Sequence, residues 1–302
     1  MYQSEDWKPN LFLVGAAKSG TTSLAELLGT ERGVQLPVLK EPFYFVEGYG
    51  IKNKDEYRAL YRSGGLWRID ASTGYLFDRL CPEKIKEFNP KAKVLIVLRN
   101  PIDFMVSYWE YMRANGSETL DFCSAISEEE ARRRHSAEFE RSCEQWPASY
   151  WYTERAFFFD QVARYLNAFE EGEVKVVLFE KIIRDKNAIK DIYSFLGLHL
   201  RGDKELPRVN ESGKARPFIH FLRFSKYLSP IKQMLYKLLP VSLRLKIRKA
   251  VFMGSMTNKG YEKFVLPSEE RAKLADIFSE DVEQLRRLLP HLEFDLWVDF
   301  SK

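Results

Sequence analysis

The sequence predicts an α/β fold in which helices cover both faces of a parallel β-sheet. Short apolar runs alternate with segments of helical spacing over roughly the first 200 residues. The runs are apolar throughout, which is typical of strands buried on both faces. The chain has 302 residues, of which 45% are hydrophobic, so it can bury a substantial core. We expect a single domain, 1–302.

The first strand and helix are expected within the stretch "LFLVGAAKSGTTSL". An apolar run at Phe12–Val14 ends at Gly15 and predicts a buried parallel strand. Thr21 or Thr22 is then expected to cap a helix. Its predicted inward-facing residues share helical spacing: Leu24, Leu27 and Leu28.

Three further strands are expected in the next part of the chain. "KEPFYF" (Lys40–Phe45) predicts a short strand or a sheet edge, and "WRIDASTGYL" a short strand that runs into a loop. "AKVLIVLRN" (Ala92–Asn100) is the clearest buried strand. Asn100 is expected to cap the following helix, with Pro101 as its first residue.

The second half of the chain is expected to continue the alternation. Residues 116–150 are charged and weakly periodic, which indicates exposed helix and loop lying over the domain. Helical spacing at 154–169 precedes a strand at Val174–Glu180. Two more helices are expected, at 187–198 and 268–289.

The loop between the first strand and helix has the composition of an anion site. Such a loop presents backbone N–H groups and the positive end of the helix dipole. Gly15 and Gly20 allow the backbone to come close to a ligand. Lys18 supplies a cation, and four residues supply hydroxyl donors: Ser19, Thr21, Thr22 and Ser23.

The loop differs from that of nucleotide triphosphatases. Their pattern GxxxxGK[ST] has lysine directly after the second glycine. Here Thr21 occupies that position and Lys18 precedes Gly20. The strand "VLIVL" ends in Arg99, where those enzymes place an Asp that holds Mg²⁺. The sequence therefore predicts an anion held without metal; the alternative is an ordinary turn with a surface lysine.

The cysteine content and the lengths of the apolar runs exclude several classes of protein. The three cysteines are widely spaced, which argues against a disulfide framework or a zinc site and favours a reducing, cytoplasmic location. No apolar run reaches the roughly 18 residues of a membrane span, and the polar start "MYQSEDWKPN" is not a signal peptide.

Residues 212–261 form a basic segment, with eleven Lys and Arg and no Asp or Glu. Leucine and aromatic residues are interleaved with these charges, which predicts an amphipathic helical pair docked on the domain. Three roles stay open: a lid that helps to bind nucleotide, contact with an anionic membrane surface, or capture of an acidic acceptor. Nucleic acid is disfavoured, because no recognised binding motif accompanies the basic residues.

Three motifs together resemble a known family. "GAAKSGTTSL", "KEPFYF" and "VLIVLRNPIDFMVSYW" are similar to the sulfotransferases that use 3′-phosphoadenosine 5′-phosphosulfate (PAPS), above all the bacterial and heparan-sulfate-type branch. The likeness continues through "DASTGYL", "EFNPKAK", "VVLFEKIIRDKNAIKDIYSFLGL" and "FDLW". It implies a P-loop-like fold, PAPS as donor, adenosine 3′,5′-bisphosphate (PAP) as product, and no metal. The implied acceptor is a hydroxyl, less often an amine, on a glycan, a small metabolite or a carrier-bound acyl chain.

The resemblance assigns the nucleotide-binding residues. Lys18 to Ser23 would cradle the 5′-phosphosulfate, with Lys18 at the oxygen that bridges sulfur and phosphorus. Arg99 and Ser107 match the pair that holds the 3′-phosphate, and Ser107 is expected about 10 Å along its helix. Lys259 in "TNKGY" resembles the Lys-Gly loop that closes over the nucleotide. Each residue also has an alternative without function: Lys18 and Lys259 would be solvated lysines, Arg99 would form a surface ion pair, and Ser107 would be a small residue that packs its helix.

The resemblance also assigns the catalytic base. Glu41 matches the carboxylate that takes the acceptor proton in the heparan-sulfate branch. The alternative is a simple ion pair with Lys40 or Lys18. None of the four histidines lies near the early motifs, so the histidine base of the cytosolic branch has no evident counterpart.

The chain departs from some relatives at Ala71, where they carry a second lysine. Either Lys40 or the basic segment takes over that charge, or the charge is not required. Asp70 is a second candidate base or the partner of a loop hydroxyl; a strand-end hydrogen bond is the alternative.

Two other functions stay open: a nucleotide kinase, which needs Mg²⁺ and an Asp after "VLIVL", and a membrane-surface binding module.

Overall fold

The computed structural model describes residues 6–127, 131, 133–143, 145–200, 202, 204–207, 214–215, 239, 243, 256–257 and 264–301. The chain divides into two compact units. The first unit comprises Met1–Phe104, Ala156–Asn210 and Leu266–Lys302, and the second Met105–Arg155 and Glu211–Val265. That the chain is a single functional domain stays a prediction.

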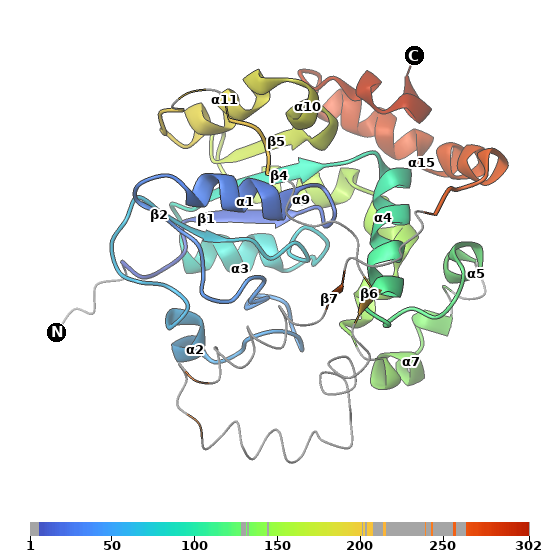
Figure 1. Cartoon of the computed structure of the whole chain (residues 1–302), viewed down its shortest axis with the longest axis horizontal. Coiled ribbons are helices and arrows are strands. Elements are labelled where there is room, and N and C mark those ends of the chain that lie inside the picture. The colour runs from blue at the N-terminus through green and yellow to red at the C-terminus, as the bar shows by residue number, and fades with distance from the viewer. Residues whose placement is uncertain are drawn as a thin grey trace. The chain divides into compact units, whose positions relative to one another are not determined.

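The first unit contains a five-stranded sheet in the order β2–β3–β1–β4–β5 (Figure 1). Every neighbouring pair is parallel. The strands are β1 (Leu11–Gly15), β2 (Val34–Gln35), β3 (Trp67–Asp70), β4 (Lys93–Leu98) and β5 (Val174–Leu178). The parallel sheet of an α/β fold is therefore confirmed, together with the strands expected from the apolar runs at 12–14, 92–100 and 174–180.

The α-helices that lie wholly in the first unit are α1 (Thr21–Gly29), α2 (Lys54–Arg58), α3 (Cys81–Phe88), α9 (Phe159–Ala168), α10 (Phe179–Arg184), α11 (Lys186–Phe195) and α15 (Ser268–Leu288). Figure 1 shows α1 and α3 on opposite sides of β1. The helix α4 (Pro101–Ala114) begins in the first unit and ends in the second. Asn100 Oδ1 accepts hydrogen bonds from Ile102 N and Asp103 N, which confirms Asn100 as its cap.

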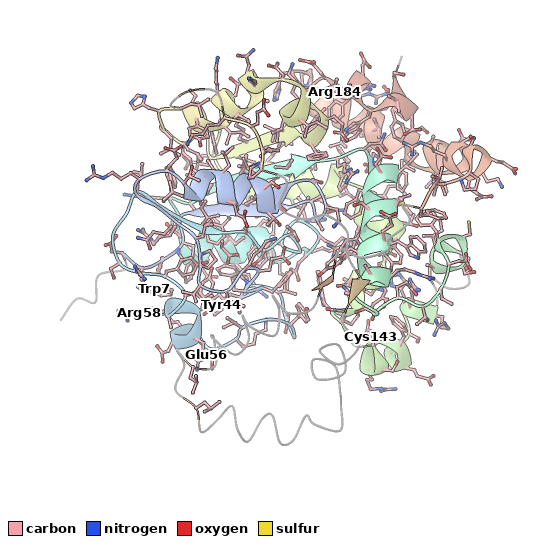
Figure 2. All side chains as sticks on the ribbon, in the orientation of Figure 1. Trp7, Tyr44, Glu56, Arg58, Cys143 and Arg184 are labelled. Atoms are coloured by element: carbon pink, nitrogen blue, oxygen red, sulfur yellow. The ribbon has the colours of Figure 1, made fainter. Side chains whose placement is uncertain are left out.

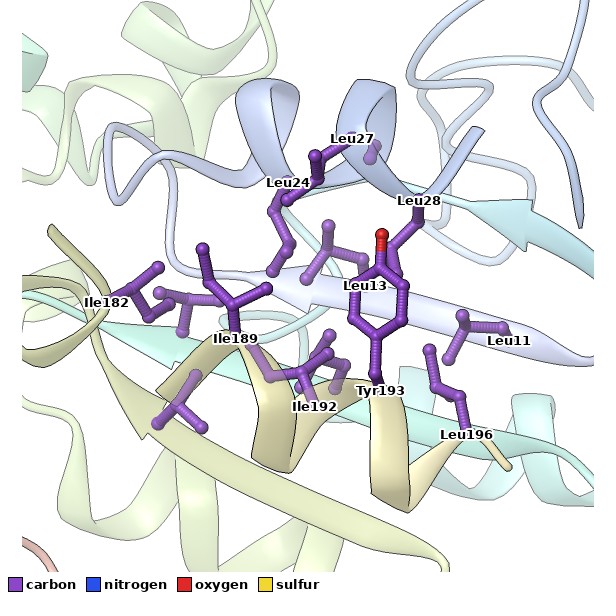
Figure 3. Close-up of a cluster of buried hydrophobic side chains, with 14 of the residues drawn as sticks. Leu11, Leu13, Leu24, Leu27, Leu28, Ile182, Ile189, Ile192, Tyr193 and Leu196 are labelled. Carbon is purple, nitrogen blue, oxygen red and sulfur yellow. The ribbon is translucent and has the colours of Figure 1, made fainter. Parts of the chain in front are cut away.

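The core on one face of the sheet lies between β1, α1 and α11 (Figure 3). Leu11 and Leu13 point to this face from β1, two residues apart as the strand period requires. The leucines predicted to face inward are all buried: Leu24, Leu27 and Leu28. Removing such a side chain from water stabilises the fold by about 1.5–3 kcal/mol.

The segment "KEPFYF" is not a strand, so that prediction is wrong. It is an irregular loop in which Glu41 (φ 54°) and Phe43 (φ 49°) adopt the left-handed conformation. Its amide groups bond to side chains instead of a neighbouring strand: Phe43 N donates to Ser72 Oγ and Tyr44 N to the Tyr75 hydroxyl. Aromatic composition favours a strand locally, but contacts with distant residues determine the conformation.

The prediction that Thr21 or Thr22 caps α1 is also wrong. Gly20, with φ 74°, is the N-cap residue, and no side chain in the described part of the chain caps the helix. The first backbone N–H groups of α1 are thus not blocked by Thr21 or Thr22. A smaller difference is that β5 ends at Leu178, because Phe179 and Glu180 begin α10.

The second unit contains the rest of α4, the helices α5 (Phe122–Ile126) and α7 (Ala137–Ser142), and a short antiparallel pair, β6 (Lys214–Ala215) with β7 (Met256–Thr257). The helix α8 (Tyr152–Ala156) lies in this unit except for its last residue. Residues 116–150 are not uniformly exposed as expected. Arg134 is 2% exposed and pairs with Glu118 at 2.6 Å. The two charged side chains can be buried because they neutralise each other in an ion pair.

Most of the basic segment 212–261, including its predicted helical pair, lies outside the described residues. Where the structure does describe the chain, none of its helices is both long and apolar enough to cross a membrane.

Candidate active site

The predicted site residues of the first unit meet at the carboxyl edge of the sheet. Parallel strands end at a common edge, and ligands of open α/β sheets bind outside it. β1 lies between β3 and β4. The loop containing Lys18 follows β1, the loop containing Ser72 follows β3, and Arg99 follows β4 directly. Three motifs far apart in the sequence are therefore brought to one edge.

The loop after β1 is held tightly by its neighbours. Ala16 N donates to Val97 O of β4 at 2.6 Å. A Cβ atom at Gly15 would lie 2.7 Å from Leu76 Cβ and 3.1 Å from Thr73 O, so only glycine fits against the loop that follows β3. Lys18 has φ 61°, an uncommon conformation for a lysine. Such conformations persist where the surrounding structure holds them, as at ligand sites.

Gly20 and Phe179 pack against each other where α1 begins. Gly20 has φ 74°, and a Cβ atom there would lie 2.7 Å from Phe179 Cε2. Of the loop hydroxyls, those of Ser19 and Thr21 belong to buried residues, whereas Thr22 and Ser23 are half-buried. The uncapped end of α1 beside these hydroxyls has the donors and the dipole orientation that suit a phosphate group.

Arg99 lies against the Lys18 loop. Its Nη1 donates to the backbone oxygen of Lys18 at 2.9 Å, and its guanidinium carbon lies 5.3 Å from the centre of the Phe179 ring. The structure thus brings together Lys18 and Arg99, which the sequence assigned to different phosphates. Sequence reasoning missed Phe179; its only signal was an aromatic residue immediately after a buried strand.

Glu41 is connected to the same loop through Lys40. Lys40 Nζ donates to Thr22 Oγ1 and lies 3.6 Å from Glu41 Oε1. Thr73 Oγ1 also donates to Glu41 Oε1, at 3.3 Å. The side chains of Lys40 and Glu41 are 31% and 27% exposed, so solvent and ligands reach both. The ion pair of Glu41 with Lys40, the alternative raised above, is present, and it places the carboxylate beside the phosphate loop.

Asp70 has no exposed surface and lies at the end of β3. Oδ2 accepts hydrogen bonds from the hydroxyls of Tyr57 (2.6 Å) and Tyr75 (3.0 Å), and Oδ1 accepts one from Ser72 Oγ (2.7 Å). Burial raises the pKa of Asp70 from 3.8 to about 6. Because an acceptor cannot touch a fully buried group, Asp70 fits the role of hydroxyl partner better than that of base. Sequence reasoning missed Tyr57, Ser72 and Tyr75.

The remaining predicted residues lie elsewhere. Ala71 is buried at the end of β3, whereas the cation nearest to Glu41 among the ion pairs of the described residues is Lys40. Ser107 is half-buried on the part of α4 that belongs to the second unit, so its place in the site stays a prediction. Lys259 lies outside the described residues. In the part of the chain that the structure describes, no three His, Cys, Asp or Glu residues are arranged to hold a metal ion.

The family of the chain follows from comparison with known proteins. The sulfotransferase domain family matches residues 8–286, which is most of the chain. The chain therefore belongs to this family and is a sulfotransferase, and the family implies PAPS as cosubstrate. The resemblance seen in the motifs is confirmed.

Curated relatives include the bifunctional heparan sulfate N-deacetylase/N-sulfotransferase 1 of Xenopus laevis. It is 23% identical over 204 residues, which is 63% of this chain and 22% of that protein. The Caenorhabditis elegans protein of the same name is 26% identical over 112 residues, 35% of this chain and 13% of its own length. The chain thus spans less than a quarter of these relatives. A solved structure, the sulfotransferase from Alicyclobacillus acidocaldarius, is 25% identical with a TM-score of 0.67, and the match covers 96% of this chain and 99% of that chain.

Proposed function

We propose that this enzyme transfers a sulfonate group from PAPS to a hydroxyl or amine of a glycan by in-line displacement, with Lys18 on the leaving side and Glu41 as base. One observation carries the proposal. Lys40 contacts both Thr22 of the phosphate loop and Glu41, so the predicted donor loop and the predicted base lie side by side. The two curated relatives named as heparan sulfate N-sulfotransferases favour a glycan acceptor. A small metabolite and a carrier-bound acyl chain are the other acceptors to test.

The phosphate loop would hold the 5′-phosphosulfate. The phosphosulfate oxygens would accept hydrogen bonds from the N–H groups at the uncapped start of α1. They would also accept hydrogen bonds from the loop hydroxyls, those of Ser19, Thr21, Thr22 and Ser23. Lys18 would contact the oxygen that bridges sulfur and phosphorus. Negative charge grows on that oxygen as the bond to sulfur breaks, so a cation there stabilises the transition state more than the ground state.

Glu41 would accept the proton of the attacking acceptor group. The acceptor oxygen or nitrogen forms a bond to sulfur, the bond between sulfur and the bridging oxygen breaks, and PAP leaves. The acceptor proton passes to a Glu41 carboxylate oxygen, which makes the acceptor a better nucleophile. Lys40, between Glu41 and Thr22, would neutralise charge on the sulfonate in place of the lysine that is absent at Ala71.

The 3′-phosphate would be bound by Arg99, with Ser107 and Lys259 as further proposed ligands. Arginine offers five N–H donors, of which one bonds to Lys18 O, and its planar shape suits phosphate. No metal is required in this scheme, because Lys18, Lys40 and Arg99 neutralise the charge of the donor. The basic segment 212–261 would attract an acidic acceptor such as a sulfated glycan.

Thermal unfolding with nucleotides tests the donor site. We expect PAP without metal to stabilise the protein, by about 2.7 kcal/mol at a hundredfold its dissociation constant. ATP with Mg²⁺ should stabilise it much less. Stabilisation by ATP with Mg²⁺ alone would favour a nucleotide kinase and overturn the proposal.

Transfer of labelled sulfonate from PAPS tests the chemistry. The acceptor panel comprises N-desulfated and O-desulfated glycans, small alcohols and carrier-bound hydroxy acids. Glu41→Gln should bind PAP like the wild type while its transfer rate falls about 10²- to 10⁴-fold. Glu47→Gln, a change of the same kind at an exposed residue of the same loop, is the matched control. Wild-type rates in Glu41→Gln would exclude Glu41 as the base.

A further inference from the structure

The carboxylate of Asp70 is connected to the Glu41 loop through two hydroxyl groups. Ser72 Oγ donates to Asp70 Oδ1 at 2.7 Å and accepts a hydrogen bond from Phe43 N at 3.1 Å. The Tyr75 hydroxyl donates to Asp70 Oδ2 at 3.0 Å and accepts one from Tyr44 N at 2.9 Å. Two parallel chains of hydrogen bonds thus run from β3 to the loop that carries Glu41.

The direction of these bonds depends on Asp70. A hydroxyl group has one proton and two lone pairs. An ionised carboxylate only accepts hydrogen bonds, so both hydroxyls direct their protons to Asp70 and present lone pairs to the amides of Phe43 and Tyr44. Without an acceptor at Asp70, each hydroxyl is free to rotate its proton toward the loop and repel the amide.

The loop needs such support because its backbone is strained. Glu41 (φ 54°) and Phe43 (φ 49°) are both in the left-handed region, which non-glycine residues seldom adopt. Two backbone hydrogen bonds also hold the loop: Ile51 N donates to Pro42 O at 2.8 Å, and Val46 N donates to Phe43 O at 3.3 Å. The amides of Phe43 and Tyr44, which bond to these hydroxyls, lie two and three residues after Glu41, so the bonds restrain the backbone from which its carboxylate projects.

We propose that Asp70 is a positioning residue for Glu41: it orients Ser72 and Tyr75, which hold the Glu41 loop in the conformation required for proton transfer. The proposal rests on the proposed role of Glu41 as base. Asp70 itself touches neither donor nor acceptor, because it has no exposed surface.

Tyr57 provides a matched control. Its hydroxyl donates to the same carboxylate oxygen of Asp70 at 2.6 Å, whereas the amides of Phe43 and Tyr44 bond to Ser72 and Tyr75. Tyr44 lies beside α2 (Figure 2), and its ring stacks on that of Tyr57 with centroids 4.1 Å apart. Tyr57→Phe keeps this stacking and removes only a bond to Asp70.

Amide hydrogen exchange measures the proposed restraint without any assumption about activity. Ser72→Ala should speed exchange at Phe43 and Tyr75→Phe at Tyr44. Asp70→Asn should speed exchange at the amide whose hydroxyl partner faces the new NH2 group, because asparagine keeps only one acceptor oxygen. Tyr57→Phe should leave both amides as in the wild type. Unchanged exchange at both amides in Asp70→Asn would overturn the proposal. So would equal acceleration by Tyr57→Phe, because loss of any bond to Asp70 would then have the same effect.

Kinetics connect the restraint to Glu41. Asp70→Asn, Ser72→Ala and Tyr75→Phe should lower kcat roughly 10- to 100-fold, with little change in KM for PAPS. In the Glu41→Gln background, Asp70→Asn should cause no further loss of kcat, because the group that it positions is already absent. An equal further loss in that background would contradict the proposal. If Glu41→Gln alone leaves kcat unchanged, the assignment of the base fails, whereas the exchange result still reports on the restraint. Ser72→Ala, the smallest change, keeps the test valid if Asp70→Asn folds poorly.

Discussion

Arg99 Nη1 donates a hydrogen bond to the backbone oxygen of Lys18, at a distance of 2.9 Å. The bond joins the end of β4 to the loop that follows its neighbour β1. Lys18 has φ 61°, and the bond from Arg99 holds its carbonyl group in that conformation. Arg99 therefore fixes the phosphate loop, and we propose that it also binds the nucleotide.

The first prediction concerns Arg99→Lys. Lysine keeps the charge but loses the planar set of donors, so it cannot bond to Lys18 O and a phosphate in the same way. A charged hydrogen bond contributes about 1.5–3 kcal/mol, so PAP affinity should fall by about tenfold or more. Isothermal titration with PAP and with AMP checks this. A loss that is equal for the two nucleotides would argue against a contact with the 3′-phosphate.

The second prediction concerns Lys18→Ala. Loss of the cation beside the bridging oxygen should lower kcat about 10²- to 10³-fold, the usual effect of removing one group that stabilises transition-state charge. Stability should change little, because Lys18 is only half-buried. Lys91→Ala, at an exposed lysine, is the control. Turnover like that of Lys91→Ala would remove Lys18 from the mechanism.

The third prediction concerns Gly20→Ala. The new methyl group would meet the Phe179 ring at 2.7 Å, and φ 74° is unfavourable for alanine. We expect about 1–3 kcal/mol of destabilisation, and weaker PAP binding because the start of α1 must move. Gly172→Ala is the matched control: φ is 83° there, and no atom of the described residues lies within 4 Å of the added atom. Equal losses in the two variants, measured by urea unfolding, would show that contact with Phe179 is unimportant.

The fourth prediction is a pH dependence of stability. Burial raises the pKa of Asp70 from 3.8 to about 6. The folded state therefore binds more protons than the unfolded state between about pH 4 and pH 6, and the contribution of Asp70 to the free energy of unfolding falls as pH rises through this range. Relative to Asp70→Asn, the wild type should lose up to a few kcal/mol across that range. Urea unfolding of both proteins gives the difference; a constant difference, or one that grows as pH rises, contradicts the buried state of this carboxyl group.

Elements with strong local signals were predictable from the sequence. The apolar run that forms β4 and the Asn100-Pro101 start of α4 need no distant partner to be recognised. The loop at Lys40–Phe45 was predicted wrongly, because the side chains that bind its amides come from residues about 30 positions later. The buried pair of Arg134 and Glu118 was missed for a similar reason, since a charged stretch indicates exposure unless its partners are known.

The residues of the candidate site also differ in how far the sequence alone reveals them. Lys18, Glu41 and Arg99 stand in motifs that are visible in the sequence. Phe179 was missed because its role depends on β5 ending beside Gly20, and the bonds from Asp70 to Ser72 and Tyr75 were missed because they depend on where β3 ends. Candidate site residues could be named from the sequence, and their roles stay predictions, whereas the groups that contact them could be found only from the fold.

The most direct test of the central claim is a crystal structure of this chain with PAP. We expect the 5′-phosphate in the loop from Lys18 to Ser23, at the uncapped end of α1. The Arg99 guanidinium should contact the 3′-phosphate, and the Glu41 carboxylate should face the side from which an acceptor enters. PAP bound elsewhere, with Lys18 and Arg99 turned away from both phosphates, would contradict it.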